Sequence, residues 1–473
     1  MISLYDTAQQ KVVPLAQRDP GKVSMYVCGP TVYGPPHLGH GRAVLVYDLL
    51  RRYLTWAGVE VEHVSNITDI DDKIIDRAIN ENRDSVEIAV KCEAIWWDAM
   101  DRIDVLRPHK TPHATAYVDE MVELIADLIT KDKAYVTSDG VYLAVETVEG
   151  YGMLANQSLD SLLEGGGERE VVGGEKRHPA DFALWKFSKP GEPVWPSPWG
   201  DGRPGWHTEC VVMSLGLLGD GFDLHTGGMD LRFPHHENER AQAVAMGYRF
   251  ANHWMHNGFV ELEGEKMSKS LGNVKNLLDL TEQYDPRAYR LLIMRSHYRS
   301  PMEVTDVAMT DAEAALDRLD TAARRTQHLV GDGVVPGGDG SGAGSTAGIR
   351  AGADAEVLAQ FQSVMNDDLD TPGAVDLLFR QVREANTAVD RGDDEAARRA
   401  AITLREIAGA LGLRIVVDDS DVPADIAALV VERQEARQAK DFARADEIRD
   451  TLASAGWGIE DSADGPVARR LKS

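Results

Sequence analysis

The chain has 473 residues, which at roughly 150 residues per domain predicts about three domains. Hydrophobic residues make up 43% and charged residues 27% of it, an ordinary balance for a globular protein that buries a core. The 77 acidic residues exceed the 50 basic ones, and the net charge of −27 argues against a protein that binds nucleic acid through bulk positive charge. This composition is still compatible with a local basic surface.

Cysteine use and the lack of a targeting pattern predict a cytoplasmic protein. The three cysteines, Cys28, Cys92 and Cys210, are too few and too scattered for a disulfide framework. The first residues lack the basic segment followed by an apolar segment that marks a signal peptide. No apolar run approaches the roughly 18 residues of a membrane span.

The amino-terminal part of the chain predicts a βαβ unit. Residues 23–27 (VSMYV) form an apolar strand, and the turn-rich segment CGPTVYGPPHLGH follows it. Residues 41–58 have apolar positions at helical spacing, with Gly58 as the helix stop, and residues 59–68 are typical of a second strand. This order predicts a doubly wound parallel sheet, Rossmann-like in organisation.

The sheet is predicted to be interrupted by an insertion. Residues 118–165 indicate a helix and short strands, and residues 163–177 (LEGGGEREVVGGEKR) indicate a mobile polar loop. Alternation of strand and helix resumes near residues 205–260, where WMHNGFVELEG is typical of a strand and a turn.

Beyond about residue 302 the pattern becomes helical. Residues 306–330 have the composition of an amphipathic helix, and residues 331–352 form a Gly/Ser/Ala-rich flexible linker. More helix is expected to about residue 412. The tail, residues 424–473, is predicted to be a pair of helices ending in a turn-rich segment.

Two cysteines, a histidine and a glutamate form a candidate metal site. Pro234 suits the first position of a helix, and a helix that begins there would put His235 and Glu239 on one face, at i and i+4. Together with Cys28 and Cys210, these side chains match the ligand preferences of zinc.

Each of these elements has a plainer interpretation. A lone buried cysteine is usually a small hydrophobic residue, and a His–Glu pair on a helix is more often a solvated face. His236 is an alternative to His235, because it also shares a face with Glu239. Cys92 lies among apolar helical positions and is interpreted as a core residue.

Two further segments could bind a nucleotide. PPHLGH places His37 and His40 where a helix should begin, and a helix N-terminus favours phosphate. GEKMSKSLGN puts Lys266 and Lys269 in a loop from which a lysine can neutralise charge on a phosphate undergoing displacement. A polar helix cap and a solvated turn are the alternatives.

The tail carries a candidate nucleic-acid contact. Arg433, Arg437, Lys440 and Arg444 are spaced 4, 3 and 4 apart, which predicts one helical face that could meet phosphates. Acidic residues interleave with them, so a solvated face is an equal alternative.

HLGH and KMSKS, in this order around a predicted βαβ sheet, are the paired signatures of the class I aminoacyl-tRNA synthetases. Within that class CGPTVYGPPHLGH, NITDIDDKII, FALWKFSKPGEPVWPSPWGDGRPGWHTEC, TGGMDLRFPHHENE and KMSKSLGN resemble the cysteinyl-tRNA synthetase family. The resemblance extends from about residue 20 to the end and includes KDFARADEIRDTLASAGWGIED. The chain departs from the family in HLGH for the commoner HIGH, in a longer linker at 331–352 and in the ending DGPVARRLKS.

The resemblance implies a role for each matching residue. The implied zinc ligands are Cys28, Cys210, His235 and Glu239. The implied catalytic residues are His37, His40, Lys266 and Lys269. The implied ATP-binding residues are His37, Gly39, His40 and Lys269. The implied substrate pocket comprises Gly29, Thr31, Thr68, Trp206, His225 and Asp230. The candidate tRNA contacts Arg433, Arg437, Lys440 and Arg444 rest on their spacing alone.

The implied fold is an α/β catalytic domain with a doubly wound parallel sheet and an insertion, then an α-helical anticodon-binding domain and a small C-terminal domain. The expected boundaries are 1–117 for the first half of the catalytic domain, 118–200 for the connective insertion, 201–260 for the second half, 261–315 for the KMSKS loop and stem-contact region, 316–412 for the helical anticodon-binding bundle with the linker 331–352, and 413–473 for the C-terminal tRNA-contacting domain.

The implied activity is a ligase that activates L-cysteine with ATP to cysteinyl adenylate and transfers it to the 3′ end of cysteine tRNA. One Zn²⁺ per subunit would select the substrate thiol, Mg²⁺ would accompany ATP, and the enzyme would be a monomer without a membrane partner. A purely structural zinc is the alternative for the metal.

Two other functions compete with this one. A cysteine:amino-sugar ligase of mycothiol synthesis shares the adenylate-forming half but would not need residues 302–473. A non-catalytic, zinc-containing tRNA-binding paralogue is the second alternative, and the intact HLGH and KMSKS argue against it.

Overall fold

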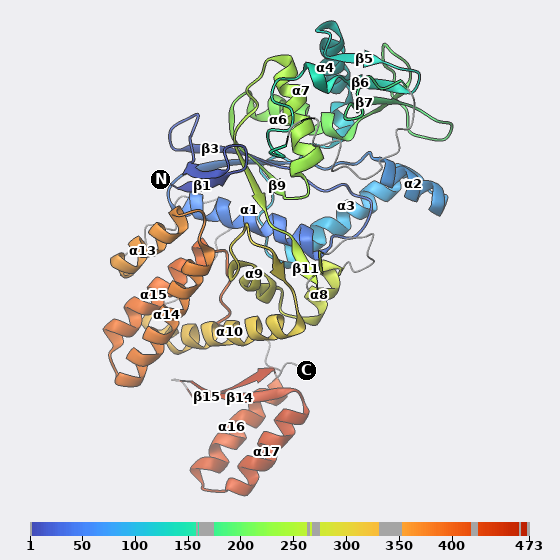
Figure 1. Ribbon diagram of the computed structural model, residues 1–473. Helices are drawn as coiled ribbons and strands as arrows, with labels where there is room; N and C mark the ends of the chain where they lie inside the picture. Colours follow the sequence, from blue (N-terminus) through green and yellow to red (C-terminus); the bar gives the residue numbers. More distant parts are fainter. Residues whose placement is uncertain are drawn as a thin grey trace. The chain divides into compact units, whose positions relative to one another are not determined.

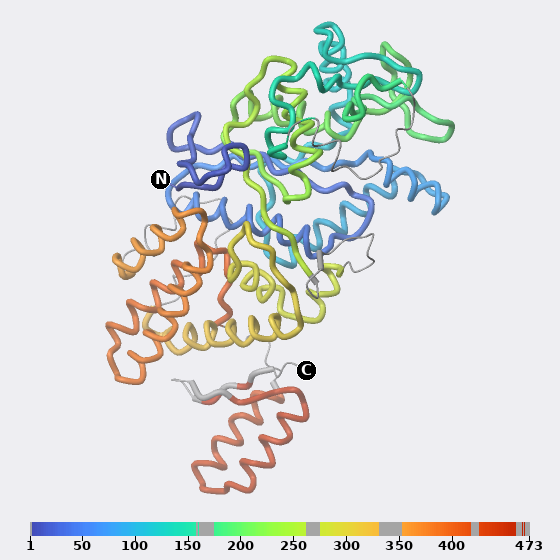
Figure 2. The backbone as a smooth tube through the Cα atoms, in the orientation of Figure 1, coloured from blue at the N-terminus to red at the C-terminus, as the bar shows by residue number. Residues whose placement is uncertain are grey.

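The computed structural model describes residues 2–157, 159, 175–262, 265–266, 275–330, 352–417, 424–462 and 465–470. The chain divides into two units. The first comprises Met1–Glu313, Gln360–Val375 and Ala410–Gly412, and the second comprises Ala314–Ala359, Asp376–Gly409 and Leu413–Ser473. Figure 1 names the helices and strands, and Figure 2 traces the backbone.

A four-stranded parallel sheet forms the centre of the first unit. Its order is β10 (Ala251–Asn257), β9 (Phe222–Gly228), β3 (Lys22–Val27) and β4 (Glu60–Ser65), and each neighbouring pair is parallel. The helix α1 (Leu38–Trp56) connects β3 to β4 and begins three residues earlier than the sequence predicted. The doubly wound sheet is confirmed, and its strands are buried along most of their length, as strands covered on both faces must be.

The insertion contains an antiparallel sheet. Its order is β5 (Ala134–Val136), β6 (Gly140–Leu143), β7 (Phe182–Phe187) and β8 (Gly202–Pro204), and α4 (Val118–Thr130) precedes it. Figure 2 shows this part in cyan and green, between the two halves of the parallel sheet in chain order. The predicted mobile loop lies mostly outside the described residues.

The other elements of the first unit connect these sheets. They are β1 (Ser3–Asp6), β2 (Lys11–Pro14), α2 (Asp72–Glu81), α3 (Ser85–Arg102), η1 (Ala114–Tyr117), η2 (Val145–Thr147), α6 (Trp206–Leu218), η3 (Arg232–His236), α7 (Glu237–Met246), α8 (Leu277–Gln283) and α9 (Pro286–Met294). A small sheet of order β12 (Glu265–Lys266), β11 (Val260–Leu262) and β13 (Met302–Glu303) follows β10.

The segment expected to start a helix at Pro234 differs from the prediction. The regular helix α7 begins at Glu237, and the preceding turn η3 is a π-helical turn in which Phe233 has extended backbone angles. Pro234 follows the extended Phe233 and belongs to this turn, and the peptide bond between them is cis. The prediction of a regular helix from Pro234 was therefore wrong by three residues.

The region after residue 303 is helical, as predicted. Its helices are α10 (Asp306–Arg325), α11 (Gln327–Val330), α13 (Ala355–Asn366), α14 (Thr371–Arg391) and α15 (Asp394–Ala410). The linker 331–352 lies almost entirely outside the described residues.

The tail ends in a hairpin instead of a turn-rich segment. The helices α16 (Ala424–Gln438) and α17 (Phe442–Ser454) are followed by β14 (Trp457–Ser462) and β15 (Gly465–Arg470), which pair in antiparallel fashion. Ile426, Val430, Ile448 and Leu452 pack in a small core with Ala468 of the hairpin. The glycines near the end of the chain suggested turns, but the apolar residues between them form a strand that covers this core.

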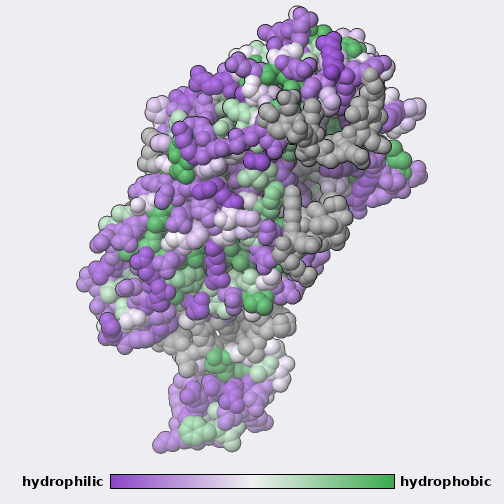
Figure 3. All heavy atoms as spheres, viewed as in Figure 1, coloured by the Kyte–Doolittle hydropathy of each residue, from purple (hydrophilic) through white to green (hydrophobic). Residues whose placement is uncertain are grey.

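The molecular surface agrees with the charged composition. The face in Figure 3 is mostly hydrophilic, with small hydrophobic areas scattered over it. Most charged side chains on this face therefore lie at the surface. Charged side chains that are buried, such as Asp48 and Arg290, indicate specific interactions in the core.

A buried carboxylate ties α1 to α9. Asp48 accepts hydrogen bonds from Arg290 at 2.7 Å, from Arg52 at 2.8 Å and from the backbone N–H of Leu106 at 2.9 Å. Arg290 also donates to the carbonyl of Asp104 at 2.7 Å. Burial would raise the pKa of Asp48, but Arg290 and Arg52 outweigh it and hold the pKa below its ordinary value.

Asp48→Asn should lower the free energy of unfolding by about 3 kcal/mol at pH 7, because the buried Arg290 loses its charged partner. The contribution of Asp48 is present above the pKa of an unfolded aspartate and is lost as the pH falls through its lower folded pKa. Urea denaturation of both proteins should therefore show the difference shrinking below about pH 4. Asp19→Asn, which removes an exposed partner of Arg18, should change stability by less than about 1 kcal/mol. Equal effects of the two substitutions would contradict this assignment.

Candidate metal and nucleotide centre

The four predicted metal ligands lie together. Cys28 directly follows β3, Cys210 is in α6, His235 is in η3 and Glu239 is in α7. The two sulfur atoms are 3.7 Å apart, Cys28 Sγ is 3.5 Å from Glu239 Oε1, and Cys210 Sγ is 3.7 Å from His235 Nε2. One ligand atom from each residue lies within 4.8 Å of the others.

This donor set fits zinc. Zn²⁺ is bound by thiolates, imidazoles and carboxylates in tetrahedral geometry, with Zn–S distances of about 2.3 Å, which separates two sulfur ligands by roughly 3.8 Å. The observed separation of the sulfurs is 3.7 Å. The cluster is thus a group that could hold a metal ion.

The side chains of the cluster shift one another's pKa values. Burial raises the pKa of the Cys28 thiol, whereas hydrogen bonds from Cys28 and His235 overcome burial and lower the pKa of Cys210 to about 6. Burial would also lower the pKa of His235, but the Glu239 carboxylate raises it to about 10. Protons are thus shared among these ligands, and a bound metal cation would replace them.

Side chains outside the predicted ligand set orient the ligands. His225 Nε2 lies 2.6 Å from the second carboxylate oxygen of Glu239, and His207 Nδ1 lies 2.9 Å from His235 Nδ1. The ring of Trp206 stacks on His235 with 4.1 Å between centroids. Such hydrogen bonds to ligands fix their orientation and tautomer. His207 was missed by the sequence reasoning, although it lies three residues before Cys210 on the same helix.

Asn66 is a second residue that the sequence reasoning missed. Its Oδ1 accepts a hydrogen bond from the backbone N–H of Gly29 at 2.8 Å and lies 3.7 Å from Cys210 Sγ. Its Nδ2 donates to Thr68 Oγ1 at 3.1 Å, and that hydroxyl donates to Glu209 at 2.7 Å. Asn66 therefore joins the two segments that carry the cysteines.

His236, the alternative to His235, and Cys92, interpreted as a core residue, lie in different places. Cys28, His225, His236 and Glu239 form a second, overlapping group with ligand spacing, so geometry alone leaves His236 open. His236 Nδ1, however, is 2.8 Å from His256 Nε2 in the core. Cys92 is buried in α3 and lies outside both groups.

The first nucleotide signature lies at the N-terminus of α1. The backbone N–H of His37 donates to His40 Nδ1 at 3.2 Å, and the two rings stack with 3.7 Å between centroids. His40 thus caps the helix, which is the structural alternative named above, and the position at a helix N-terminus also suits phosphate. Lys266 ends β12, and Lys269 lies outside the described residues.

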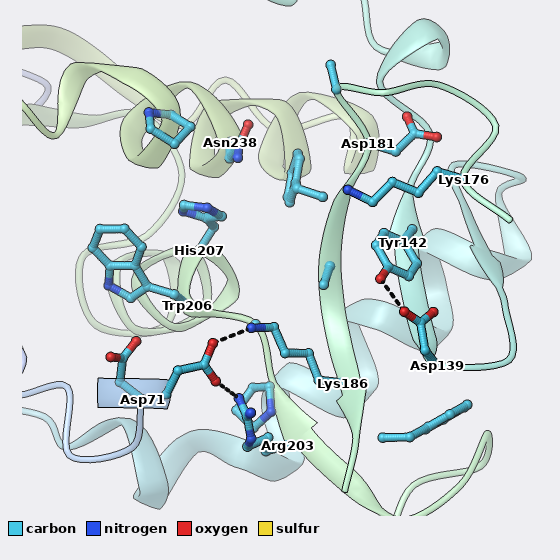
Figure 4. Close-up of a pocket in the computed structure, with 18 of the residues that line it drawn as sticks. Asp71, Asp139, Tyr142, Lys176, Asp181, Lys186, Arg203, Trp206, His207 and Asn238 are labelled. Atoms are coloured by element: carbon cyan, nitrogen blue, oxygen red, sulfur yellow. Dashed lines mark hydrogen bonds and ion pairs between the residues drawn. The ribbon is translucent and has the colours of Figure 1, made fainter. Parts of the chain in front are cut away.

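A cavity of about 1380 Å³ adjoins the metal ligands. Trp206, His207 and Asn238 line its end near η3 and α7, and Lys176, Asp139 and Tyr142 line the end in the insertion (Figure 4). Between these ends, Lys186 and Arg203 both form ion pairs with Asp72, at 2.6 and 2.5 Å. Because α2 begins with Asp72, these pairs attach the antiparallel sheet to the first half of the catalytic unit.

The six predicted pocket residues are not all equally accessible. Trp206 is the one that lines this cavity, whereas Thr68 and His225 are buried and hydrogen-bonded to Glu209 and Glu239. Gly29 and Thr31 follow β3 and are partly buried, and Asp230 is exposed after β9. Their roles toward substrate stay predictions.

The predicted basic stripe does not form one face. Arg433 and Arg437 are in α16, but that helix ends at Gln438 and Lys440 has a left-handed backbone with φ of 63°. Arg444 is in α17, where it forms ion pairs with Glu432 and Glu447, each at 2.7 Å. The spacing of 4, 3 and 4 predicted one continuous helix, and the break at 439–441 makes that prediction wrong.

Three family models match the chain in succession. Residues 14–314 match the tRNA synthetases class I (C) catalytic domain, residues 360–415 the DALR domain and residues 419–466 the cysteinyl-tRNA ligase anticodon binding domain. The chain belongs to the cysteine–tRNA ligase family. The resemblance and the fold class expected from the sequence are therefore confirmed.

Similar proteins extend over the whole chain. The protein named Cysteine--tRNA ligase from Chromobacterium violaceum is 42% identical, over 99% of this chain and 100% of its own length. That from Desulforudis audaxviator is 42% identical over 98% of this chain and 99% of its own length. That from Acinetobacter baylyi is 41% identical over 99% and 98%, respectively.

Solved structures share the fold of the family's class. Mycobacterium tuberculosis methionyl-tRNA synthetase in complex with methionyl-adenylate has a TM-score of 0.60 at 15% identity, covering 82% of this chain and 90% of that one. A leucyl-tRNA synthetase of Agrobacterium radiobacter K84 in a ternary complex has a TM-score of 0.59 at 11% identity, covering 84% and 85%. Within the part of the chain that the structure describes, no helix has the length and apolar character needed to cross a membrane.

Cys210→Ala should lower zinc affinity by more than about 100-fold, because even outer hydrogen-bond partners of metal ligands contribute 10–100-fold. Metal content after dialysis, measured by mass spectrometry, should fall well below one ion per chain. Cys92→Ala is the matched control, since it removes a buried thiol outside the cluster and should keep the parental content. Equal metal contents in the two variants would exclude Cys210 as a ligand.

Proposed function

We propose that the chain activates L-cysteine with ATP to cysteinyl adenylate and transfers the cysteinyl group to the 3′ end of cysteine tRNA, acting as a cytoplasmic monomer. The observation that carries this proposal is the presence, in one chain, of the class I catalytic domain and the cysteinyl-tRNA ligase anticodon binding domain. Full-length relatives that bear the name Cysteine--tRNA ligase support it.

We propose that Cys28, Cys210, His235 and Glu239 hold zinc, and that the site selects the substrate thiol. When bound, zinc favours a thiolate over a hydroxyl ligand and so supplies the distinction between cysteine and serine. A pocket without it would separate two such isosteres by only about a hundredfold. The structural support is the position of the cluster, which borders the cavity through Trp206 and His207. A purely structural zinc would have no need of that position.

We propose that the two signatures serve the first reaction step. The cysteine carboxylate attacks the α-phosphorus of ATP, the bond from that phosphorus to the bridging oxygen breaks, and pyrophosphate leaves; Mg²⁺ would accompany ATP and neutralise charge on its phosphates. His37 and His40, at the N-terminus of α1, are assigned to the phosphates, with Gly39 between them. Lys266 and Lys269 are assigned to the charge that develops during displacement. In the second step the 2′-hydroxyl of the terminal ribose attacks the carbonyl carbon and AMP leaves.

Local contacts with tRNA are assigned to the tail. Arg433 and Arg437 both lie in α16, spaced one turn apart, and we propose that they meet phosphates of the anticodon stem. Arg444 is less suited, because Glu432 and Glu447 already neutralise its charge. The amino-sugar ligase is the less favoured alternative, because it would leave the DALR and anticodon binding domains without a role.

Cysteine-dependent ATP–pyrophosphate exchange tests the first step and the selector together. The parental chain should exchange pyrophosphate with cysteine and far less with serine. Cys210→Ala should reduce the ratio of kcat/KM for cysteine over serine by at least tenfold, whereas Cys92→Ala should leave it unchanged. A ratio that survives in Cys210→Ala would overturn the selector and leave zinc a structural role.

Transfer of radiolabelled cysteine tests the acceptor. The full chain should attach the label to a cysteine tRNA transcript in a base-labile bond and should not attach it to an amino-sugar acceptor. The terminal 2′-deoxy form of the same tRNA is the matched control, because it lacks the attacking hydroxyl. Label on the amino sugar but not on the tRNA would replace the proposed function by the alternative ligase, and exchange without either product would contradict both.

A further inference from the structure

Arg42 is a buried cation that bonds almost entirely to backbone carbonyls. It lies in α1, two residues after His40, and is 1% exposed. Its Nη1 donates to the carbonyl of Phe259 at 2.6 Å, and its Nη2 donates to the carbonyls of Tyr298 at 3.2 Å and Ser300. Its Nε has no hydrogen-bond partner within the described residues, and the carboxylate charge of Glu261 acts on it only as a minor influence that raises its pKa.

The buried guanidinium of Arg42 and the two segments whose carbonyls it contacts stabilise each other. Burial lowers the pKa of Arg42 to about 10, so the group stays charged at neutral pH. A charged donor strengthens a hydrogen bond to roughly twice the strength of a neutral one. The carbonyls therefore stabilise the charge, and the charge in turn fixes where the two segments that carry them can lie.

Those two segments begin the strands of the small sheet that carries Lys266. Phe259 directly precedes β11, and the turn that contains Tyr298 and Ser300 leads into β13. The strands β11 and β13 pair in parallel, and β12 pairs with β11 so that Lys266 lies opposite Glu261. Arg42 therefore contacts the residues that lead into β11 and β13, two strands of the small sheet that contains Lys266.

The approach of the two segments is unusually close at Gly258. Its backbone N–H donates to the carbonyl of Tyr298 at 2.8 Å. A Cβ atom at this position would lie 2.6 Å from the carbonyl oxygens of Arg299 and Ser300, a distance that no side chain tolerates. The backbones of the two segments thus pack closely beside the guanidinium, and only glycine fits at position 258.

The chain after the second signature also returns to the first. The backbone N–H of Leu38 donates to the carbonyl of Lys275 at 3.2 Å, and that of Leu277 donates to the carbonyl of Pro36 at 3.0 Å. Tyr289 donates its hydroxyl to the carbonyl of Leu38 at 2.6 Å. Backbone on both sides of the second signature is therefore anchored to the start of α1. Arg42 provides the side-chain contact on the side that precedes the signature.

We propose that Arg42 is a positioning residue that fixes β11 and β13 on α1, the helix whose N-terminus carries the first nucleotide signature. This inference rests on the proposed function for its kinetic consequence, but its structural part stands on the contacts alone. Arg42 does not touch the nucleotide, since its terminal nitrogens are engaged inside the protein. A lysine at this position has one nitrogen in place of a planar fork and cannot reach both segments.

Arg42→Lys in the full-length chain tests the inference, with Arg290→Lys as the matched control. Arg290 is equally buried and bonds to Asp48 and to carbonyls, but away from the small sheet. In pyrophosphate exchange, Arg42→Lys should lower kcat/KM for ATP at least tenfold while KM for cysteine and metal content stay within twofold. Arg290→Lys should lose thermal stability but keep kcat/KM for ATP within twofold.

A purely structural role for Arg42 would give a different pattern. Equal changes in the two variants, an unchanged kcat/KM for ATP, or a rise in KM for cysteine as large as that for ATP would each overturn the inference. Hydrogen–deuterium exchange gives a readout that needs no activity. Amides of residues 260–262 and 302–303 should exchange at least tenfold faster in Arg42→Lys, and those of β3, β4 and β9 should not change.

Failure of the proposed function is distinguishable from failure of this inference. A parental chain without cysteine-dependent exchange would contradict the proposed function, and the hydrogen–deuterium comparison would then decide the role of Arg42 by itself. Faster exchange confined to the two short segments supports the positioning role. Unchanged exchange there overturns it.

Discussion

Two sulfur atoms, an imidazole nitrogen and a carboxylate oxygen lie within 4.8 Å of one another in a buried site, and a cation among them would stabilise the charged forms of these side chains. Much of the first unit positions these side chains. The parallel sheet places Cys28 at the end of β3 and His225 on the neighbouring β9, while α6 and α7 add Cys210 and Glu239. The Glu239 carboxylate raises the pKa of His235, and a metal cation bound in the cluster would take over this favourable interaction. The packing of four separate segments thus creates a group that could hold a metal ion.

The same sheet also sets where the nucleotide signatures lie. The turn after β3 runs from Cys28 to the start of α1, so the metal ligand and His37 are only nine residues apart. The chain after β10 returns through the small sheet to Arg42, and then from Lys275 to Leu38. The chain segments before and after the second signature are therefore both anchored to the first turns of α1, where the first signature lies. Positioning of this kind is what a displacement at phosphorus needs most, because catalysis there depends on orientation and charge.

Patterns in the sequence predicted the parallel sheet and the ligand cluster because local periodicity and residue chemistry decide them. Strand, glycine-rich turn and helix follow one another within β3 and α1. Ligand chemistry made Cys28 and Cys210 candidates, the apolar neighbours of Cys92 set it aside, and the family resemblance completed the ligand set. What lay beyond prediction depends on contacts distant in the chain. Asn66 bridges the two cysteine segments, and Arg42 meets carbonyls more than two hundred residues away, neither of which leaves a periodic signal. The break at Lys440 was missed for another reason. The left-handed backbone of this lysine leaves no mark in the sequence, because lysine is also common within helices.

The correction in the tail changes how an acidic chain would meet tRNA. With a net charge of −27, attraction at long range is weak or repulsive, and binding must come from a few short contacts. A continuous stripe of four basic residues would have supplied such contacts along one helix. In the structure Arg433 and Arg437 lie on α16, whereas Arg444 forms ion pairs with Glu432 and Glu447. A tail that contacts phosphates through these two arginines alone would give a shallow dependence of affinity on salt, because each phosphate contact adds to the salt slope.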